Sequence, residues 1–201
     1  MYSTLPSFVI GFHGCDKAIG EKIIAGEESL RPSKNSYDWL GHGIYFWENN
    51  PTRAFEYATE VKNNPKMCSE KIETPFVVGA VIDLGECFNL LDSKFLQAMK
   101  LGYTALKKWT KKNHSPLPVN KTVGNSCSLI LRQLDCAVVE YVHYLRKIQD
   151  EKPFDSVRAV YREGAPIYDG TDICEKNHIQ ICVRNPNCIK GYFKPLATSK
   201  K

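Results

Sequence analysis

The sequence predicts an α+β fold, with strands near both ends of the chain and helices between them. Apolar runs rich in β-branched and aromatic residues, typical of buried strands, occur at 8–13, 43–47, 75–84, 157–161 and 178–183. Two long helical patterns lie between them, in the middle of the chain. This order differs from the regular strand–helix alternation of a doubly wound sheet. We therefore expect a single domain over residues 1–201, with a helical insertion at about 85–156.

Local signals set the ends of two short helices in the first third of the chain. Asp16 can cap a helix that runs through Ile23 and ends at Gly26, because glycine tolerates the left-handed conformation of a helix end. Pro51 can open the second helix, since the first turn of a helix has no use for the missing N–H. Residues 27–40 are expected to form an irregular loop.

The insertion is expected to hold two longer helices. The first begins near Asp92 and places Phe95, Met99, Tyr103 and Leu106 on one stripe. The second, from about 128 to 148, carries a wider apolar stripe. That stripe comprises Ile130, Leu134, Ala137, Val138, Tyr141, Leu145 and Ile148. We expect it to pack into the core and to serve no partner.

Composition bounds the class of protein. A length of 201 residues, with 43% hydrophobic and 24% charged residues, is ordinary for one globular domain. No apolar run approaches the twenty or so residues of a membrane span, and no signal-peptide pattern opens the chain. The eight cysteines form no C-x-x-C pair or zinc-like cluster. We therefore expect a cytoplasmic protein with reduced thiols, no metal and no membrane partner.

The net charge of +5 is mild, but its distribution is uneven. Four lysines surround Trp109, namely Lys107, Lys108, Lys111 and Lys112. Basic residues with an interleaved aromatic can follow a nucleic-acid backbone and stack on a base. A solvated helix face is the commoner meaning of such a run. The sequence leaves both interpretations open.

Three segments carry the chemistry of a binding site: Phe12-His13-Gly14, Gly41-His42-Gly43-Ile44-Tyr45-Phe46-Trp47 and Ala54-Phe55-Glu56-Tyr57. The backbone N–H and C=O of a glycine at a strand end can pair with a carboxamide. An aromatic face can stack on a flat ring, and an imidazole can hold a ribose hydroxyl. Together these groups suit a flat ring that carries an amide.

This combination resembles the nicotinamide pocket of ADP-ribosyltransferases of the poly(ADP-ribose) polymerase type, whose signature reads His-Gly, Gly-x-Tyr-Phe and a late Glu. The resemblance covers about half of the chain. It implies two packed, mainly antiparallel sheets that form a cleft for NAD. It also implies removal of nicotinamide and transfer of ADP-ribose through an oxocarbenium-like transition state.

The resemblance assigns roles residue by residue. His13 would bond the ribose of the adenosine half, and Gly14 would pair through its backbone with the nicotinamide amide. Tyr45 would stack on the nicotinamide and Tyr57 would cover its other face, with Ala54 packed close to the ring. His42 is expected to have a surface loop role only.

The last strand departs from the pattern, because Gln180 stands where the family places its Glu. An amide keeps a hydrogen bond to the ribose but loses a charge, which at about 4 Å and an effective dielectric near 20 could amount to about 4 kcal/mol. The loss argues against chain elongation and favours transfer of a single unit. Glu163 and Glu175 precede the strand and are alternative acceptor-side bases, although we expect surface roles for both.

Three functions remain open. The first is a mono-ADP-ribosyltransferase that uses NAD and a macromolecular acceptor, either protein or nucleic acid, as a toxin or defence protein would. The second is an NAD-consuming relative such as an RNA 2′-phosphotransferase, whose site needs several arginines, of which Arg184 is the one near the late strand. The third is a catalytically silent module that binds NAD or ADP-ribose. No hydrolase elbow or phosphate loop points elsewhere.

Overall fold

The computed structural model describes residues 8–68, 70–122 and 129–196. Its helices and strands are β1 (Val9–Asp16), α1 (Lys17–Ala25), β2 (Ile44–Glu48), α2 (Pro51–Asn63), β3 (Pro75–Ile82), β4 (Cys87–Asn89), α3 (Ser93–Lys112), α4 (Gln133–Ile148), β5 (Ser156–Tyr161), β6 (His178–Val183) and β7 (Ile189–Phe193). The four helices and five of these strands follow the predicted order, whereas β4 and β7 were not predicted and β4 lies inside the expected helical insertion. The α+β class is therefore confirmed.

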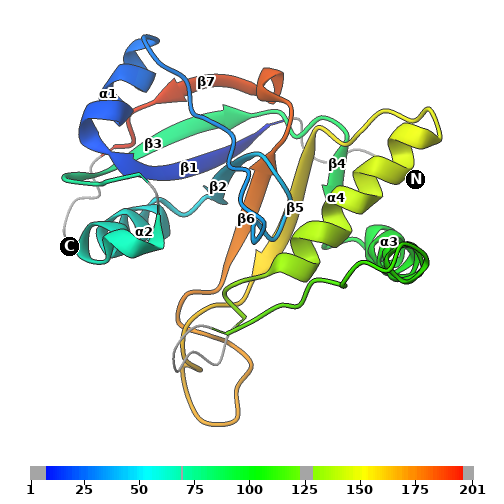
Figure 1. The fold of residues 1–201 in the computed structure, drawn as a ribbon. Coiled ribbons are helices and arrows are strands. Elements are labelled where there is room, and N and C mark those ends of the chain that lie inside the picture. Colours follow the sequence, from blue (N-terminus) through cyan, green and yellow to red (C-terminus); the bar gives the residue numbers. More distant parts are fainter. Residues whose placement is uncertain (1–7, 69, 123–128, 197–201) are drawn as a thin grey trace.

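The strands form one seven-stranded sheet in the order β4-β5-β6-β2-β1-β3-β7. Every neighbouring pair is antiparallel except β4 and β5. The expectation of two packed sheets is therefore wrong for the described residues, whose strands form one sheet. Figure 1 shows the reason: the sheet twists so strongly that β1, β3 and β7 run across the view while β5 and β6 run down it. The two expected sheets are two halves of one.

The junction between the halves is narrow. The ladder between β1 and β2 joins only two residue pairs, Gly11 with Glu48 and Phe12 with Trp47. The ladder between β1 and β3 joins eight pairs. Beyond Phe12 the first strand stays with β3 while β2 leaves it, so the sheet opens at this point.

Helices cover both faces of the sheet. On one face, Ile23 of α1 packs against Cys15 and Val78. On the other face, Ala54 of α2 packs against Phe12 and Trp47. Helix α4 covers the far half of that second face, with its buried valines against a cluster that includes Phe88, Val157 and Cys182. Side chains of alternate residues share a face, so Tyr45 and Trp47 lie between α2 and α4.

The helix ends confirm the local signals. The carboxylate of Asp16 accepts the N–H of Ala18 at 2.9 Å, and Gly26 adopts a left-handed φ of 79° at the other end of α1. Pro51 occupies the first turn of α2, with Asn50 as its cap. These ends follow from interactions within a few residues, which is why the sequence reveals them.

The stripe expected on the second long helix is partly wrong. Helix α4 begins at Gln133, and its buried residues are Cys136, Val138, Val139, Val142 and His143. Ala137 and Tyr141 are only half-buried, Ile130 precedes the helix, and Ile148 is 60% exposed. The helix packs on the sheet with one side and on α3 with another, so apolar residues remain on its outer face. Residues 123–128, at the expected start, lie outside the described part.

The apolar stripe expected on the first long helix is confirmed. Phe95 and Met99 of α3 pack against the large core cluster, and Leu106 is buried. Within the described residues, no helix is long and apolar enough to cross a membrane. The seven described cysteines have no disulfide partner.

Candidate functional site

The opening between β1 and β2 is held by a side chain. His13 Nδ1 lies 2.8 Å from the carbonyl oxygen of Tyr45. A carbonyl can only accept, so Nδ1 carries the proton and donates it. Burial lowers the pKa of His13, so the ring is neutral at pH 7 and Nε2 is left as an acceptor. The imidazole therefore ties two diverging strands together and offers one further hydrogen bond.

The backbone of Gly14 faces this opening. Ile10 accepts the N–H of Asn49 at 2.9 Å, which continues the register of the β1–β2 ladder. Because successive residues of a strand direct their N–H and C=O to opposite edges, Ile10, Phe12 and Gly14 all direct them toward β2. Gly14 would face Tyr45 if the ladder continued, but it ends at Phe12. The N–H and C=O of Gly14 thus point to the place that β2 leaves.

Packing also requires glycine at this position. A Cβ atom added to Gly14 would lie 2.2 Å from the carbonyl oxygen of Ala54 and 3.3 Å from the Cβ of Ala58. Helix α2 therefore rests directly on the backbone of β1. Ala54 is fully buried in this contact, so its small side chain has a structural explanation beside the role that the resemblance implies.

Tyr45 connects the opening to the loop that precedes β2. Burial raises the pKa of Tyr45 well above its usual range, so the hydroxyl keeps its proton. It donates to the carbonyl of Gly41 at 2.8 Å and accepts the N–H of Leu40 at 3.0 Å. Leu40 is fully buried. The loop at residues 40–41 is therefore packed on the sheet and held there by the Tyr45 hydroxyl.

The rings of His13 and Tyr45 lie on opposite faces of the strands. His13 contacts Phe46 edge to face, with ring centroids 5.9 Å apart. Tyr45 instead shares the face of Trp47, whose ring lies 5.0 Å from that of Tyr57. The aromatic groups thus flank the opening from both faces.

Tyr57 lies near the same loop. Burial is the main cause that raises its pKa, and the neighbouring Cys68, Tyr37 and Asp38 add to the rise. Tyr57 projects from α2, and Tyr37 and Asp38 belong to the loop between α1 and β2. The hydroxyl of Tyr57 is therefore protonated and faces the loop.

Gln180 has a partner that sequence reasoning missed. Its Oε1 accepts the indole N–H of Trp39 at 2.6 Å. Indole can only donate, so this bond fixes the orientation of the amide and leaves Nε2 to donate elsewhere. Register places Gln180 opposite Trp47, on the face that also carries Tyr45. The guanidinium of Arg132 lies 4.3 Å from the Trp39 ring and holds the indole from above.

The structure assigns a structural contact to Glu163. Both of its oxygens accept from Arg53 Nη2, at 2.9 and 3.1 Å. Arg53 is 4% exposed and also contacts Glu60. This network ties the loop at 162–177 to α2. Glu175 is exposed on the same loop and accepts the N–H of Ala165 at 3.3 Å.

The predicted residues thus fall into connected pairs. His13 contacts Tyr45, Gly14 contacts Ala54, and Tyr57 contacts the ring of Trp47, which lies beside Gln180. Trp39 could have been found only as an aromatic beside the Gly-rich segment, since its partner lies 141 residues away.

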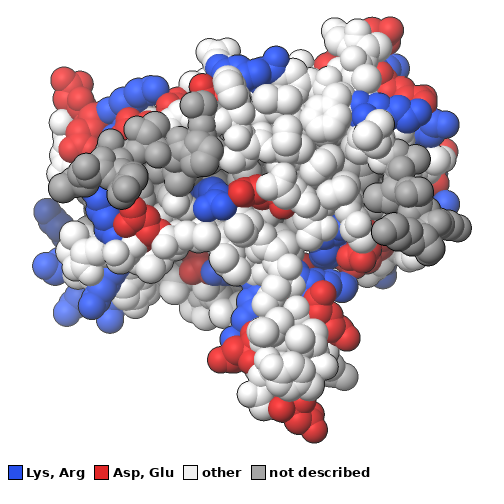
Figure 2. Space-filling view, turned by 180° about the vertical axis from the view of Figure 1, so that it is seen from behind, with Lys and Arg blue, Asp and Glu red and all other residues white. Residues whose placement is uncertain are grey.

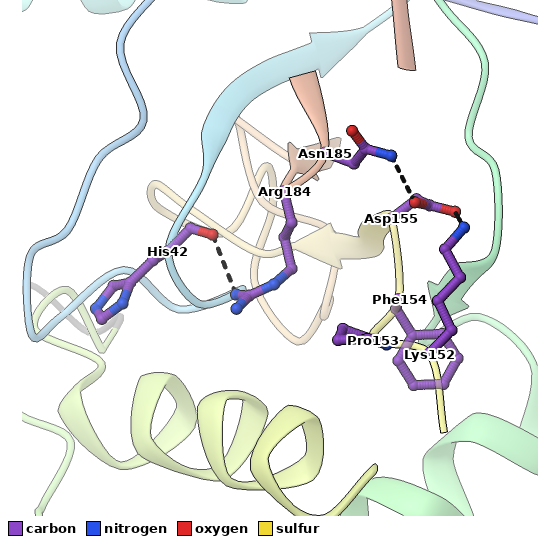
Figure 3. Close-up of a pocket in the computed structure, with 7 residues that line it drawn as sticks. All are labelled: His42, Lys152, Pro153, Phe154, Asp155, Arg184 and Asn185. Atoms are coloured by element: carbon purple, nitrogen blue, oxygen red, sulfur yellow. Dashed lines mark hydrogen bonds and ion pairs between the residues drawn. The ribbon is translucent and has the colours of Figure 1, made fainter. Parts of the chain in front are cut away.

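Two hollows lie beside this site. One of about 350 Å³, drawn in Figure 3, is lined by His42, Lys152, Pro153, Phe154, Asp155, Arg184 and Asn185. The other, of about 560 Å³, lies against α4. Neither is lined by the predicted site residues, whereas His42 lines both. The loop carrying Trp39 and Leu40 fills the face of the sheet where an open cleft was expected.

His42 is more engaged than a surface loop residue. Its backbone N–H donates to Glu140 Oε1 at 2.8 Å, and its ring Nε2 lies 4.0 Å from the sulfur of Cys136. Burial raises the pKa of Cys136 to about 12, so the thiol stays protonated and is no nucleophile. In the described part of the chain no group of three His, Cys, Asp or Glu residues could hold a metal ion.

Arginines near the site are already paired with carboxylates. Arg184 forms a two-pronged contact with Glu140, and Arg53 binds Glu163. Arg158 binds Glu48 through both of its oxygens, at 2.5 and 2.8 Å, and Arg132 binds Asp135. A site for the phosphate of an RNA 2′-phosphate end needs free guanidinium groups, so this arrangement disfavours the phosphotransferase alternative.

Comparison with known proteins finds a relative whose name gives no activity. The chain is similar to the uncharacterized protein MJ0359 of Methanocaldococcus jannaschii, with 27% identity over 193 residues that cover 89% of this chain and 83% of the relative. No protein-family model matches the chain, and no solved structure matches it. Functional conclusions therefore depend on the residues and their geometry.

Proposed function

We propose that this protein is an NAD-dependent mono-ADP-ribosyltransferase. One observation carries the proposal: the His13 imidazole bonds the Tyr45 carbonyl where β1 and β2 part. That bond takes the carbonyl that a continued ladder would offer to Gly14. It leaves a backbone donor and acceptor side by side at the opening, which is the pair that a carboxamide needs.

The proposed binding mode uses these groups directly. The N–H and C=O of Gly14 pair with the carboxamide of nicotinamide, and the neutral Nε2 of His13 accepts a ribose hydroxyl. Tyr45 and Tyr57 offer aromatic faces near the ring. The Tyr45 hydroxyl holds the loop that precedes β2 in place through Leu40 and Gly41, so entry of NAD on this face requires these two hydrogen bonds to break.

Cleavage separates nicotinamide from C1′ of the ribose, and the bond electrons leave with the nicotinamide. Positive charge then develops on C1′ and the ring oxygen until the acceptor attacks. Gln180 donates through Nε2 to the ribose and supplies no negative charge, while Trp39 fixes its orientation. Positioning and exclusion of water must therefore provide most of the rate enhancement. Without a carboxylate to activate a second ribose, transfer stops after one unit.

A second candidate is a silent module that binds NAD or ADP-ribose. The bond between Trp39 and Gln180 favours it, because the amide oxygen is already occupied. Filling of the expected cleft by the loop points the same way.

Nicotinamide release from NAD by the purified protein separates the two candidates. We expect measurable release with wild type, loss of release with Tyr45→Ala, and wild-type rates with Tyr168→Ala, an exposed tyrosine on the loop at 162–177. NAD binding by titration calorimetry without any release would favour the silent module. If wild type neither binds nor cleaves NAD, both candidates are wrong.

A further inference from the structure

Helix α3 carries the excess positive charge of the whole protein. Its 20 residues include six lysines and no Asp or Glu. Outside α3 the chain has 21 basic residues against 22 acidic ones, since the totals are 27 and 22. None of the six is in an ion pair within the described residues. Figure 2 shows blue side chains gathered at the edge of the molecule that α3 forms.

Three aromatic rings lie across α3 and α4 beside this charge. Trp109 is 44% exposed, and its ring centroid lies 6.3 Å from that of Tyr141. Tyr141 in turn lies 5.6 Å from Tyr144, which is 49% exposed. Exposed rings of this size in a row are unusual on a surface that only needs to be soluble.

Helical geometry places particular lysines next to the rings. Lys112 follows Trp109 by three residues and lies on its side of α3, and Lys108 lies next to Lys112, about 100° around the helix from Trp109. Lys100 and Lys107 lie on the side opposite Trp109. On α4, Lys147 follows Tyr144 by three residues, which makes the two side chains neighbours.

The aromatic row continues into the larger hollow. Ala137, Glu140, Tyr141 and Tyr144 have the i, i+3, i+4, i+7 spacing of one helix face. Ala137 and Glu140 line the hollow of about 560 Å³, together with Ser36 and His42 from the segment before β2 and residues 116–118 that follow α3. The acid Glu140 is neutralised there by Arg184.

We propose that this surface binds single-stranded nucleic acid. Trp109, Tyr141 and Tyr144 stack on successive bases, and Lys108, Lys112 and Lys147 contact the phosphates. Rings stack on any base that is free of a duplex, and unpaired lysines release counterions from the backbone. Helix α4 begins directly after Arg132, whose guanidinium covers the Trp39 ring. A nucleic-acid strand that lies along α4 from Tyr144 toward Gln133 therefore leads to Trp39 and the candidate NAD site.

Binding itself does not depend on NAD. The further step, that the bound strand is the acceptor of ADP-ribose, rests on the proposed function. This step would make nucleic acid, and not protein, the acceptor of ADP-ribose, which the sequence leaves open.

Fluorescence anisotropy with a labelled 20-nucleotide strand, as DNA and as RNA, tests the surface in 50 mM salt without NAD. We expect single strands to bind at least tenfold more tightly than the matching duplex. The double variant Trp109→Ala/Tyr144→Ala should weaken binding at least tenfold. Lys108→Glu/Lys112→Glu should do the same, whereas the control Lys100→Glu/Lys107→Glu, on the far side of the same helix, should cost less than threefold.

The salt dependence adds a second measurement. Removing two phosphate contacts lowers the slope of log Kd against log salt by about 1.4 for a single strand, whereas removing rings leaves the slope unchanged. If the two lysine pairs weaken binding equally, affinity depends only on the total charge of the protein and the proposal is wrong. The proposal is also wrong if wild type does not bind the strand although it is folded, as shown by cooperative unfolding. Transfer of label from NAD to the strand is measured separately. If the strand binds but is never modified, the binding surface is supported and the proposal that the bound strand is the acceptor is wrong.

Discussion

The imidazole of His13 takes the position of a sheet hydrogen bond, with its Nδ1 donating to the carbonyl of Tyr45 at 2.8 Å. In a continued β1–β2 ladder, that carbonyl would face the N–H of Gly14. The His13 side chain thus joins the two halves of the sheet at their narrow junction. It also leaves the N–H and C=O of Gly14 without the ladder partner that Tyr45 would provide. The same residue serves the fold through Nδ1 and can serve a ligand through Nε2.

The two nitrogens of His13 can be separated by mutation. The amide Nδ2 of an asparagine reaches about the position of Nδ1 but offers nothing in place of Nε2. His13→Asn should therefore keep the folding free energy near wild type and weaken NAD binding at least tenfold. His13→Ala should lose the strand contact as well, at about 1 kcal/mol of stability. Urea unfolding and NAD titration calorimetry measure the two effects.

Equal NAD affinity of His13→Asn and wild type would contradict the ligand role of Nε2. Equal stability of His13→Asn and His13→Ala would mean that the bond to Tyr45 contributes little to the fold.

Gly14 gives a prediction about packing alone. A Cβ atom at this position would lie 2.2 Å from a backbone oxygen of α2, which cannot move away without displacing the helix. Gly14→Ala should lower the free energy of unfolding by about 1–3 kcal/mol or prevent folding. Gly191, in β7, has no atom within 4 Å of its added Cβ, so Gly191→Ala is the matched control. Thermal unfolding compares them, and equal melting temperatures would mean that α2 does not rest on β1 as described.

Features governed by nearby residues were predictable from the sequence. The caps at Asp16, Gly26 and Asn50–Pro51 depend on contacts within a few positions. Five of the seven strands in the described residues followed from apolar runs, because burial on a sheet imposes that composition, whereas β4 and β7 were not predicted. Whether those strands made one sheet or two depended on how β1 and β2 meet, which no local pattern contains.

Polar partners in the candidate site were beyond sequence reasoning. Trp39 and Gln180 are 141 residues apart, and Arg53 and Glu163 are 110 apart. Donor and acceptor types alone permit many such pairings, and only the packed fold selects one. The contact between His13 and Tyr45 was equally hidden, because both residues lie in predictable strands but the place where β1 and β2 part is set by the packed fold.

The contact of Glu163 with Arg53 predicts that this acid is not a catalytic base. Glu163→Gln removes a charge from a hydrogen bond to a buried guanidinium, so it should lower stability by about 1.5–3 kcal/mol. It should leave the rate of nicotinamide release per folded molecule within twofold of wild type. Full stability together with lost activity would reverse this assignment and make Glu163 the acceptor-side base.

A buried histidine predicts loss of stability in mild acid. Burial, with help from the nearby Arg184, lowers the pKa of His143 to about 4, and its buried Nε2 has no hydrogen-bond partner among the described residues. Below pH 6.5 the unfolded chain takes up this proton and the folded chain does not, so stability falls with pH until about pH 4. Between pH 7.5 and pH 5.0 the loss amounts to about 2 kcal/mol.

His143→Phe isolates that contribution. The new ring can keep the edge contacts with Phe88 and Phe154, and the other histidines titrate alike in both proteins. Urea unfolding at pH 7.5 and pH 5.0 should show about 2 kcal/mol less acid loss in the variant. The same loss in both would mean that His143 takes up its proton in the folded state.

The pairing of Gln180 with Trp39 predicts how the missing carboxylate could be restored. In Gln180→Glu the new carboxylate accepts the indole N–H that now bonds Oε1, so the side chain should keep its place. Its negative charge then lies where positive charge develops on the ribose, and nicotinamide release should rise at least tenfold. Gln180→Ala loses the hydrogen bond and should lower release about tenfold, which corresponds to 1.4 kcal/mol.

Trp39→Phe is the control for orientation. It keeps an aromatic ring under Arg132 but cannot donate, so the amide of Gln180 is no longer held in one orientation. We expect release by Trp39→Phe to fall several-fold, and release by the double variant Trp39→Phe/Gln180→Glu to exceed it, because both oxygens of a carboxylate accept equally well. If all four variants release nicotinamide at the wild-type rate, Gln180 is a packing residue. Rates that fall with Gln180→Glu would instead indicate that the N–H of the amide binds the substrate.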